Sequence, residues 1–138
     1  MKFAFARRNV DLSLTKVIGV INVDPEDLKE LTIYKAKALA MASSGVDFIE
    51  LGVKSSKKEA LTCDEQADLI LPLLRELRLA QKVVLGVRTS DPQFMTLAAA
   101  AGAEFVVDPC ALKAEQAAQT AAKLDLPVII CANAIALQ

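Results

Sequence analysis

The chain has 138 residues, of which 54% are hydrophobic, and its 16 basic and 17 acidic residues give a net charge of -1. This length and composition are enough for one buried core. The near-zero net charge excludes a chain-wide attraction to nucleic acid or to an anionic membrane surface, so any anion site has to be local. We expect a single domain over residues 1–138, with no nucleic-acid partner and no membrane partner.

Cysteine and histidine usage narrows the chemistry. The three cysteines, Cys63, Cys110 and Cys131, lie far apart in the sequence, and there is no histidine. This excludes imidazole catalysis and the common zinc sites. The apolar stretch at the start of the chain is too short for a signal peptide, and its charged residues come too early. No apolar run approaches the roughly 18 residues of a membrane span. We expect a cytoplasmic protein.

The first predicted element is a β-hairpin within residues 1–15. Two short stretches, 3–5 and 10–14, flank Arg7, Arg8 and Asn9, and we place the turn at Arg8 and Asn9. A hairpin in this position could plug the bottom of a barrel.

After the hairpin, residues 16–138 alternate between short apolar runs and longer segments with helical spacing. The apolar runs are rich in valine and isoleucine, which predicts parallel strands covered on both faces. The predicted strands are 17–23, 48–53, 83–87, 105–107 and 128–131, and the predicted helices are 28–44, 64–80, 91–101 and 112–124. The order βαβαβαβαβ indicates an α/β fold.

Capping residues support these boundaries. Thr62 or Asp64 suits the start of the second helix, and Asp91 followed by a proline suits the start of the third. Gly45 and Gly102 suit the left-handed stops after the first and third helices.

Three segments together resemble the N-terminal part of the dihydropteroate synthase family, whose members bind pterins. They are Gly19-Val-Ile-Asn-Val-Asp-Pro25, Gly45-Val-Asp-Phe-Ile-Glu-Leu-Gly52 and Leu126-Pro-Val-Ile-Ile130. The resemblance covers nearly the whole chain and implies a (β/α)8 TIM-barrel-like fold, of which about five parallel strands, four helices and the N-terminal hairpin are present.

The resemblance also implies an activity, the condensation of a dihydropterin pyrophosphate with p-aminobenzoate in folate biosynthesis, with Mg2+ on the pyrophosphate. Asn22 matches the family asparagine that helps to hold the metal and the pyrophosphate. Asp24, Glu26 and Asp27 add further oxygen ligands for a hard cation. The same three residues also suit a turn and a helix start, which is the interpretation that we favour.

A loop after the second predicted strand concentrates hydroxyl and ammonium groups. Lys54, Ser55, Ser56 and Lys57 could cradle a phosphate or carboxylate at the barrel mouth. By resemblance, Ser55 matches a serine of the family, Ser56 keeps the hydroxyl group of a family threonine, and Lys57 stands where the family has arginine. A solvated lysine and serine loop without a ligand is the alternative.

Two positions depart from the family pattern of pterin recognition. Arg88 replaces an aspartate that accepts hydrogen bonds from the pterin, and a guanidinium group has only donors. Val107 stands where the family has a pterin-binding asparagine. Of the two polar residues that the family has at these neighbouring positions, only Asp108 remains. We expect Arg88 either to face a ligand or to form a salt bridge with Asp108 or Glu50.

Two functions from different classes follow. The first is a dihydropteroate-synthase-like protein that has lost synthase activity, with no catalytic residues, and acts as a non-catalytic interaction or regulatory module. The alternative is a pterin- or pyrophosphate-binding half of a folate-biosynthesis enzyme, completed by a partner chain or by self-association. Open edges on a five-stranded sheet favour a homo-oligomer or a partner protein in either case.

Overall fold

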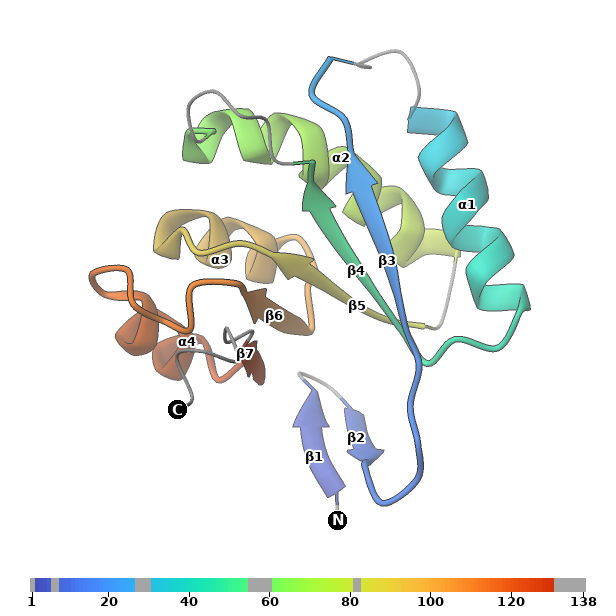
Figure 1. Cartoon of the computed structure of the whole chain (residues 1–138), viewed down its shortest axis with the longest axis horizontal. Helices are drawn as coiled ribbons and strands as arrows, with labels where there is room; N and C mark the ends of the chain where they lie inside the picture. The colour runs from blue at the N-terminus through green and yellow to red at the C-terminus, as the bar shows by residue number, and fades with distance from the viewer. Residues whose placement is uncertain (1, 6–7, 27–30, 55–60, 81–82, 131–138) are drawn as a thin grey trace, which may run out of the picture.

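The centre of the protein is a five-stranded parallel sheet in the strand order β3-β4-β5-β6-β7 (Figure 1). The computed structural model describes residues 2–5, 8–26, 31–54, 61–80 and 83–130. The strands are β3 Ile18–Val23, β4 Phe48–Val53, β5 Val84–Arg88, β6 Phe105–Asp108 and β7 Val128–Ile130. All four pairings are parallel, which confirms the predicted α/β architecture.

Four helices follow the strands and neighbour one another along one side of the sheet (Figure 1). They are α1 Leu31–Ser43, α2 Cys63–Ala80, α3 Pro92–Ala100 and α4 Ala117–Leu124. Their apolar side chains bury the helix-facing side of the strands. Ile49, Leu51 and Leu85 on the strands and Leu73 and Leu74 on α2 have no exposed surface. Among the described residues, no helix has the length and apolarity needed to cross a membrane.

Local capping chemistry fixes the helix ends. The Thr62 hydroxyl oxygen accepts from the Glu65 N–H at 3.2 Å, and the Glu65 carboxylate accepts from the Thr62 N–H at 3.3 Å, so Thr62 is the cap of α2. Asp91 caps α3 by accepting from the Gln93 N–H at 2.9 Å. Gly45 and Gly102 have φ angles of 94° and 108°, as the left-handed stops require.

The predicted start of the last helix at residue 112 is wrong, because α4 begins at Ala117. The segment between β6 and α4 is a turn in which Ala111, Leu112 and Gln116 have positive φ angles of 53°, 60° and 67°. These values interrupt helical geometry, although the residue types themselves favour a helix.

The N-terminal hairpin is present, but its predicted turn is wrong. β1 Lys2–Phe5 pairs with β2 Arg8–Asp11, with Phe5 opposite Arg8, so positions 8 and 9 belong to β2 and not to a turn. Phe5 is buried against Phe48 and Phe105, with ring centroids 5.2 Å and 6.1 Å away, and Phe48 lies 5.7 Å from Phe105. This aromatic cluster, the aromatic floor, closes the amino-terminal end of the inner sheet face.

Candidate functional site

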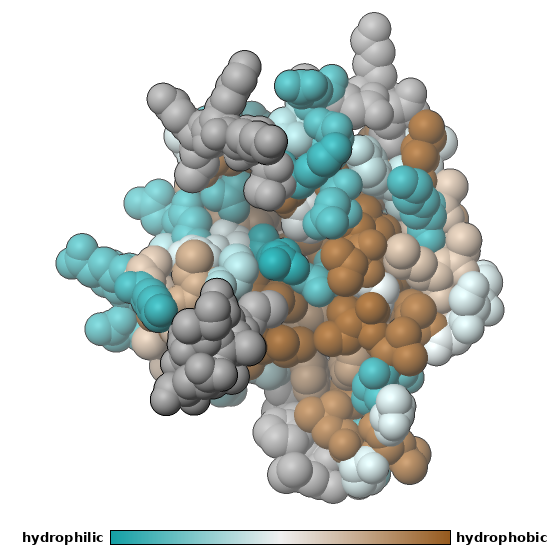
Figure 2. All heavy atoms as spheres, in the orientation of Figure 1, coloured by the Kyte–Doolittle hydropathy of each residue, from teal (hydrophilic) through white to brown (hydrophobic). Residues whose placement is uncertain are grey.

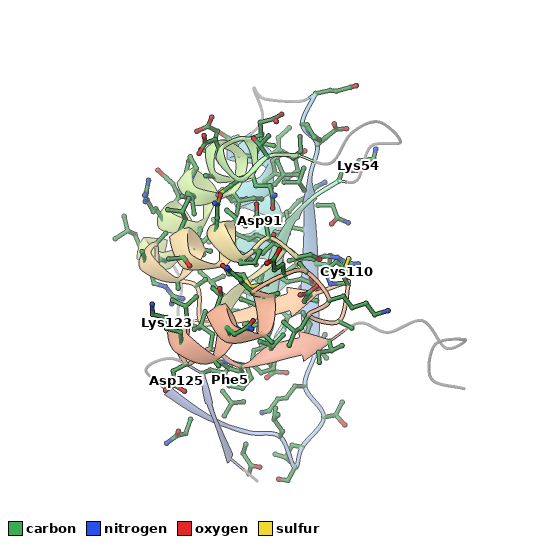
Figure 3. All side chains as sticks on the ribbon, turned by 90° about the vertical axis from the view of Figure 1, so that its left-hand side faces the viewer. Phe5, Lys54, Asp91, Cys110, Lys123 and Asp125 are labelled. Atoms are coloured by element: carbon green, nitrogen blue, oxygen red, sulfur yellow. The ribbon has the colours of Figure 1, made fainter. Side chains whose placement is uncertain are left out.

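Polar side chains meet at the carboxyl ends of three neighbouring strands, on the sheet face opposite the helices. Asn22 on β3 is paired in register with Gly52 on β4, and Arg88 ends β5 beside them. We call Asn22, Gly52 and Arg88 the inner rim. Lys54 follows β4 at this end of the sheet, whereas Phe5 of the aromatic floor lies at the other end (Figure 3).

Glycine at position 52 lets the other two side chains of the inner rim come together. A Cβ atom on Gly52 would lie 3.1 Å from the Arg88 Cβ, 3.5 Å from the Arg88 Cδ and 3.7 Å from the Asn22 Oδ1. The amide of Asn22 and the stem of Arg88 therefore flank the same empty position. Both side chains are exposed, so they can meet a ligand from solvent.

The Arg88 guanidinium group forms no ion pair and no hydrogen bond with the rest of the described chain, so the expected salt bridge with Asp108 or Glu50 is not formed. An exposed guanidinium group keeps its hydration and does not need an internal partner, unlike a buried one. Its donors remain available to an external acceptor.

Asp108 lies on the other face of the sheet from the inner rim and is fully buried. Its Oδ1 accepts from the Ser90 hydroxyl and from the Cys110 N–H, both at 2.8 Å, and its Oδ2 accepts from the Leu112 N–H at 3.1 Å. The carboxylate thus holds the turn between β6 and α4. We therefore leave Asp108 out of the candidate site, although the sequence prediction included it.

Lys54 is exposed and has a local partner. Its Nζ lies 3.7 Å from the Asp24 Oδ2, and the Asp24 Oδ1 accepts from the Glu26 N–H at 3.0 Å. Asp24 thus serves the turn after β3, which was one of the two interpretations of this segment. The predicted anion-binding residues Ser55, Ser56 and Lys57 lie outside the described residues, as does Asp27.

The described residues do not form a magnesium site by themselves. Mg2+ takes oxygen ligands, usually including one or two carboxylates. No group of three or more Asp, Glu, Cys or His side chains comes together in the described ranges, and the aliphatic stem of Arg88 lies on the other side of the Gly52 position from the Asn22 amide. The positive charge of Arg88 favours an anionic or carbonyl-bearing ligand over a bare cation.

The sequence prediction gave Glu50 only the part of a salt-bridge partner, yet it is the one charged side chain in the middle of the inner sheet face among the described strands. It is 6% exposed, it is flanked by Val20 and Gly86, and its Oε2 has no hydrogen-bond partner in the described part of the chain. Burial raises the pKa of the Glu50 carboxyl group, and the field of Arg88 offsets only part of that shift. A lone glutamate in the apolar run 48–53 was the available sequence signal.

Comparison with known proteins places this geometry in a family. Residues 18–136 match the family model described as pterin binding enzyme. The chain belongs to this pterin-binding family. The match extends from the first strand of the parallel sheet to beyond β7, and so it includes all three residues of the inner rim.

Individual pterin-binding relatives agree with this assignment. Dihydropteroate synthase of Haemophilus influenzae is 29% identical, with 94% of this chain and 50% of the relative aligned. The structure of Yersinia pestis dihydropteroate synthase with a pterine-sulfa conjugate superposes with a TM-score of 0.84 at 30% identity, covering 94% of this chain and 49% of that one. The Xanthomonas albilineans enzyme in complex with 7,8-dihydropteroate gives a TM-score of 0.80 at 27% identity, covering 92% and 47%. The chain therefore spans about half the length of these relatives.

Proposed function

We propose that this chain is a ligand-binding half of a dihydropteroate-synthase-type barrel, which binds a pterin or pyrophosphate ligand at its inner rim and does not make dihydropteroate on its own. The observation that carries the proposal is the pair of exposed, ligand-accessible side chains, Asn22 and Arg88, at the carboxyl ends of β3 and β5, the strands on either side of β4. In barrels of this class, ligand sites are built at these strand ends.

The chemistry of the inner rim supports binding more than catalysis. Arg88 offers up to five N–H donors, and Asn22 offers both a donor and an acceptor. Neither group is a base or a nucleophile at neutral pH, so the pair can orient a phosphate or a carbonyl group but cannot itself transfer a proton. Val107, the neighbour of Arg88 on β6, is apolar and adds no further hydrogen bond.

Calorimetric titration tests this proposal, with dihydropterin pyrophosphate, pyrophosphate and pteroic acid as ligands, each with and without Mg2+. We expect binding of at least one ligand and its loss in Arg88→Ala. Arg75→Ala is the matched control, because Arg75 is an exposed arginine on α2, away from the inner rim. Absence of binding by all three ligands would reject the proposal, as would synthesis of dihydropteroate by the purified chain alone.

A second candidate function, an interaction module, is favoured by exposed apolar side chains along the β3 edge of the sheet. Figure 2 shows hydrophobic side chains gathered in the region of β3. The exposed apolar residues of β3, its entry and α1 are Val17, Val20, Leu31, Ile33 and Leu39, which are between 38% and 52% exposed. A helix with apolar residues on both its buried and its exposed sides is typical of one covered by a further partner.

Sedimentation equilibrium over a wide concentration range tests this second candidate. We expect self-association that is weakened by Ile33→Asp on α1. Leu79→Asp is the control, because Leu79 is 91% exposed but lies on α2. A strict monomer at every concentration would remove self-association from consideration.

A further inference from the structure

Glu50 is a buried carboxylate whose hydrogen-bonding capacity is not used inside the described chain. A carboxylate accepts through two oxygen atoms, and leaving a buried polar atom unpaired costs free energy. Natural proteins pair most buried polar atoms, so an orphan at a candidate site indicates a group that an external molecule satisfies. The orphan here is the Glu50 Oε2.

The position of Glu50 connects this orphan to the inner rim. Glu50 and Gly52 are two residues apart on β4, so they face the same side, and Glu50 lies about 6.6 Å below the rim. Because Gly52 has no side chain, the position above Glu50 on this face of β4 is open, and the Asn22 Oδ1 and the stem of Arg88 lie beside it. Beneath Glu50, Phe48 of the aromatic floor continues the same face of β4.

We propose that Glu50 is a specificity-determining residue that accepts hydrogen bonds from the amino-pyrimidine edge of a pterin. A 2-amino-4-oxopyrimidine presents the 2-amino group and N3–H as adjacent donors, followed by the O4 carbonyl as an acceptor. Glu50 takes the donors, and Arg88 donates to the carbonyl. This inference rests on the proposed function, because it places a pterin at the inner rim.

The charge state of Glu50 gives the inference a second readout. Burial favours the neutral acid, whereas hydrogen bonds from a ligand favour the carboxylate. Arg88 on β5 is the charged side chain whose field reaches Glu50, and the facing residues of β3, Val20 and Asn22, are uncharged. Pterin binding therefore favours the ionised carboxylate, and affinity falls as the pH is lowered.

Titration of the intact chain with 6-hydroxymethylpterin and with 6-hydroxymethyllumazine tests the inference. The lumazine has a 2-oxo group where the pterin has the 2-amino group, so it turns an acceptor towards the carboxylate. We expect the wild type to prefer the pterin by about tenfold or more. Glu50→Gln keeps the shape of the side chain, and in this variant the preference and the acid dependence of affinity should both disappear, with pyrophosphate binding unchanged.

The outcomes separate the inference from the function on which it rests. Pterin binding with the same preference and pH dependence in Glu50→Gln overturns the role of Glu50 and leaves the proposed function standing. Should that variant not fold, equal affinities of the wild type for the pterin and the lumazine overturn the inference by themselves. A wild type that binds no pterin overturns the inference, and one that also binds no pyrophosphate or pteroic acid overturns the proposed function as well.

Discussion

Of the glycines in the chain, Gly86 is the one at which an added Cβ atom would come closest to a neighbour, which makes Gly86→Ala a sharp test of the fold. A Cβ atom on Gly86 would lie 2.5 Å from the Phe105 Cε1 and 2.6 Å from the Cδ1 and Cγ of the same ring. The ring cannot retreat, because Phe105 is fully buried and packs against Phe5 and Phe48. Overpacking of this kind costs about 2 kcal/mol of the free energy of unfolding.

The matched control is Gly19→Ala on the neighbouring part of the same sheet. A Cβ atom there would lie 2.8 Å from the Met41 Sδ, at the flexible end of a partly buried side chain. Methionine has three rotatable bonds and moves away at little cost, so the change in the free energy of unfolding should stay below about 0.5 kcal/mol.

Urea unfolding followed by circular dichroism measures both variants. With a denaturant slope of about 2 kcal/mol per molar, Gly86→Ala should lower the unfolding midpoint by about 1 M and Gly19→Ala should barely move it. Adding Phe105→Leu to Gly86→Ala should give a loss smaller than the sum of the two single losses, because the smaller side chain relieves the contact. Equal midpoints for the two alanine variants would refute the reasoning about the rigid ring.

Three further predictions concern the hairpin, the buried carboxyl group and the turn after β6. Phe5→Ala should lower the free energy of unfolding by about 3 kcal/mol, because it opens the aromatic floor; a loss below about 1 kcal/mol in urea unfolding would show that the hairpin does not close the sheet. Glu50→Gln should stabilise the chain at neutral pH by about 1 kcal/mol, since burial disfavours the carboxylate that is lost. The raised pKa of Glu50 means that the wild type gains stability as the pH falls through that pKa, so the difference between the two proteins should shrink on acidification; thermal melts at neutral and acidic pH check this, and a pH-independent difference would contradict it. Asp108→Ala should cost about 3 kcal/mol by leaving three donors unpaired, whereas Arg88→Ala should change stability by less than about 0.5 kcal/mol; similar losses in denaturant unfolding would mean that Arg88 is also structural.

Strand and helix positions followed from local patterns in the sequence. The predicted strand at 48–53 matches β4, and the predicted helix at 64–80 matches α2 to within one residue. The caps at Asp91 and the stops at Gly45 and Gly102 were also predicted, because a cap depends on hydrogen bonds between residues close in sequence. Asn22 was likewise predicted at a strand end, since its place depends only on where β3 stops.

The start of α4 and the role of Asp108 were not predicted. Leu112 belongs to a segment of good helix formers, but the Asp108 carboxylate accepts from its N–H and holds a turn there. The turn in the hairpin was predicted wrongly for a different reason, because the pairing of Phe5 with Arg8 depends on where the Phe5 ring packs. A local side-chain hydrogen bond outweighed helix propensity at Leu112, and tertiary packing outweighed the local turn signal in the hairpin.

The sequence by itself determined the number, type and order of the strands and helices, because apolar periodicity and capping act over a few neighbouring residues. Only the tertiary structure decided that Arg88 is exposed at the inner rim without a partner among the described residues, that Asp108 faces the helices, and that the Glu50 Oε2 has no hydrogen-bond partner in the described part of the chain. These outcomes depend on strand register, which alternates side chains between the two faces of the sheet, and on burial by residues distant in sequence.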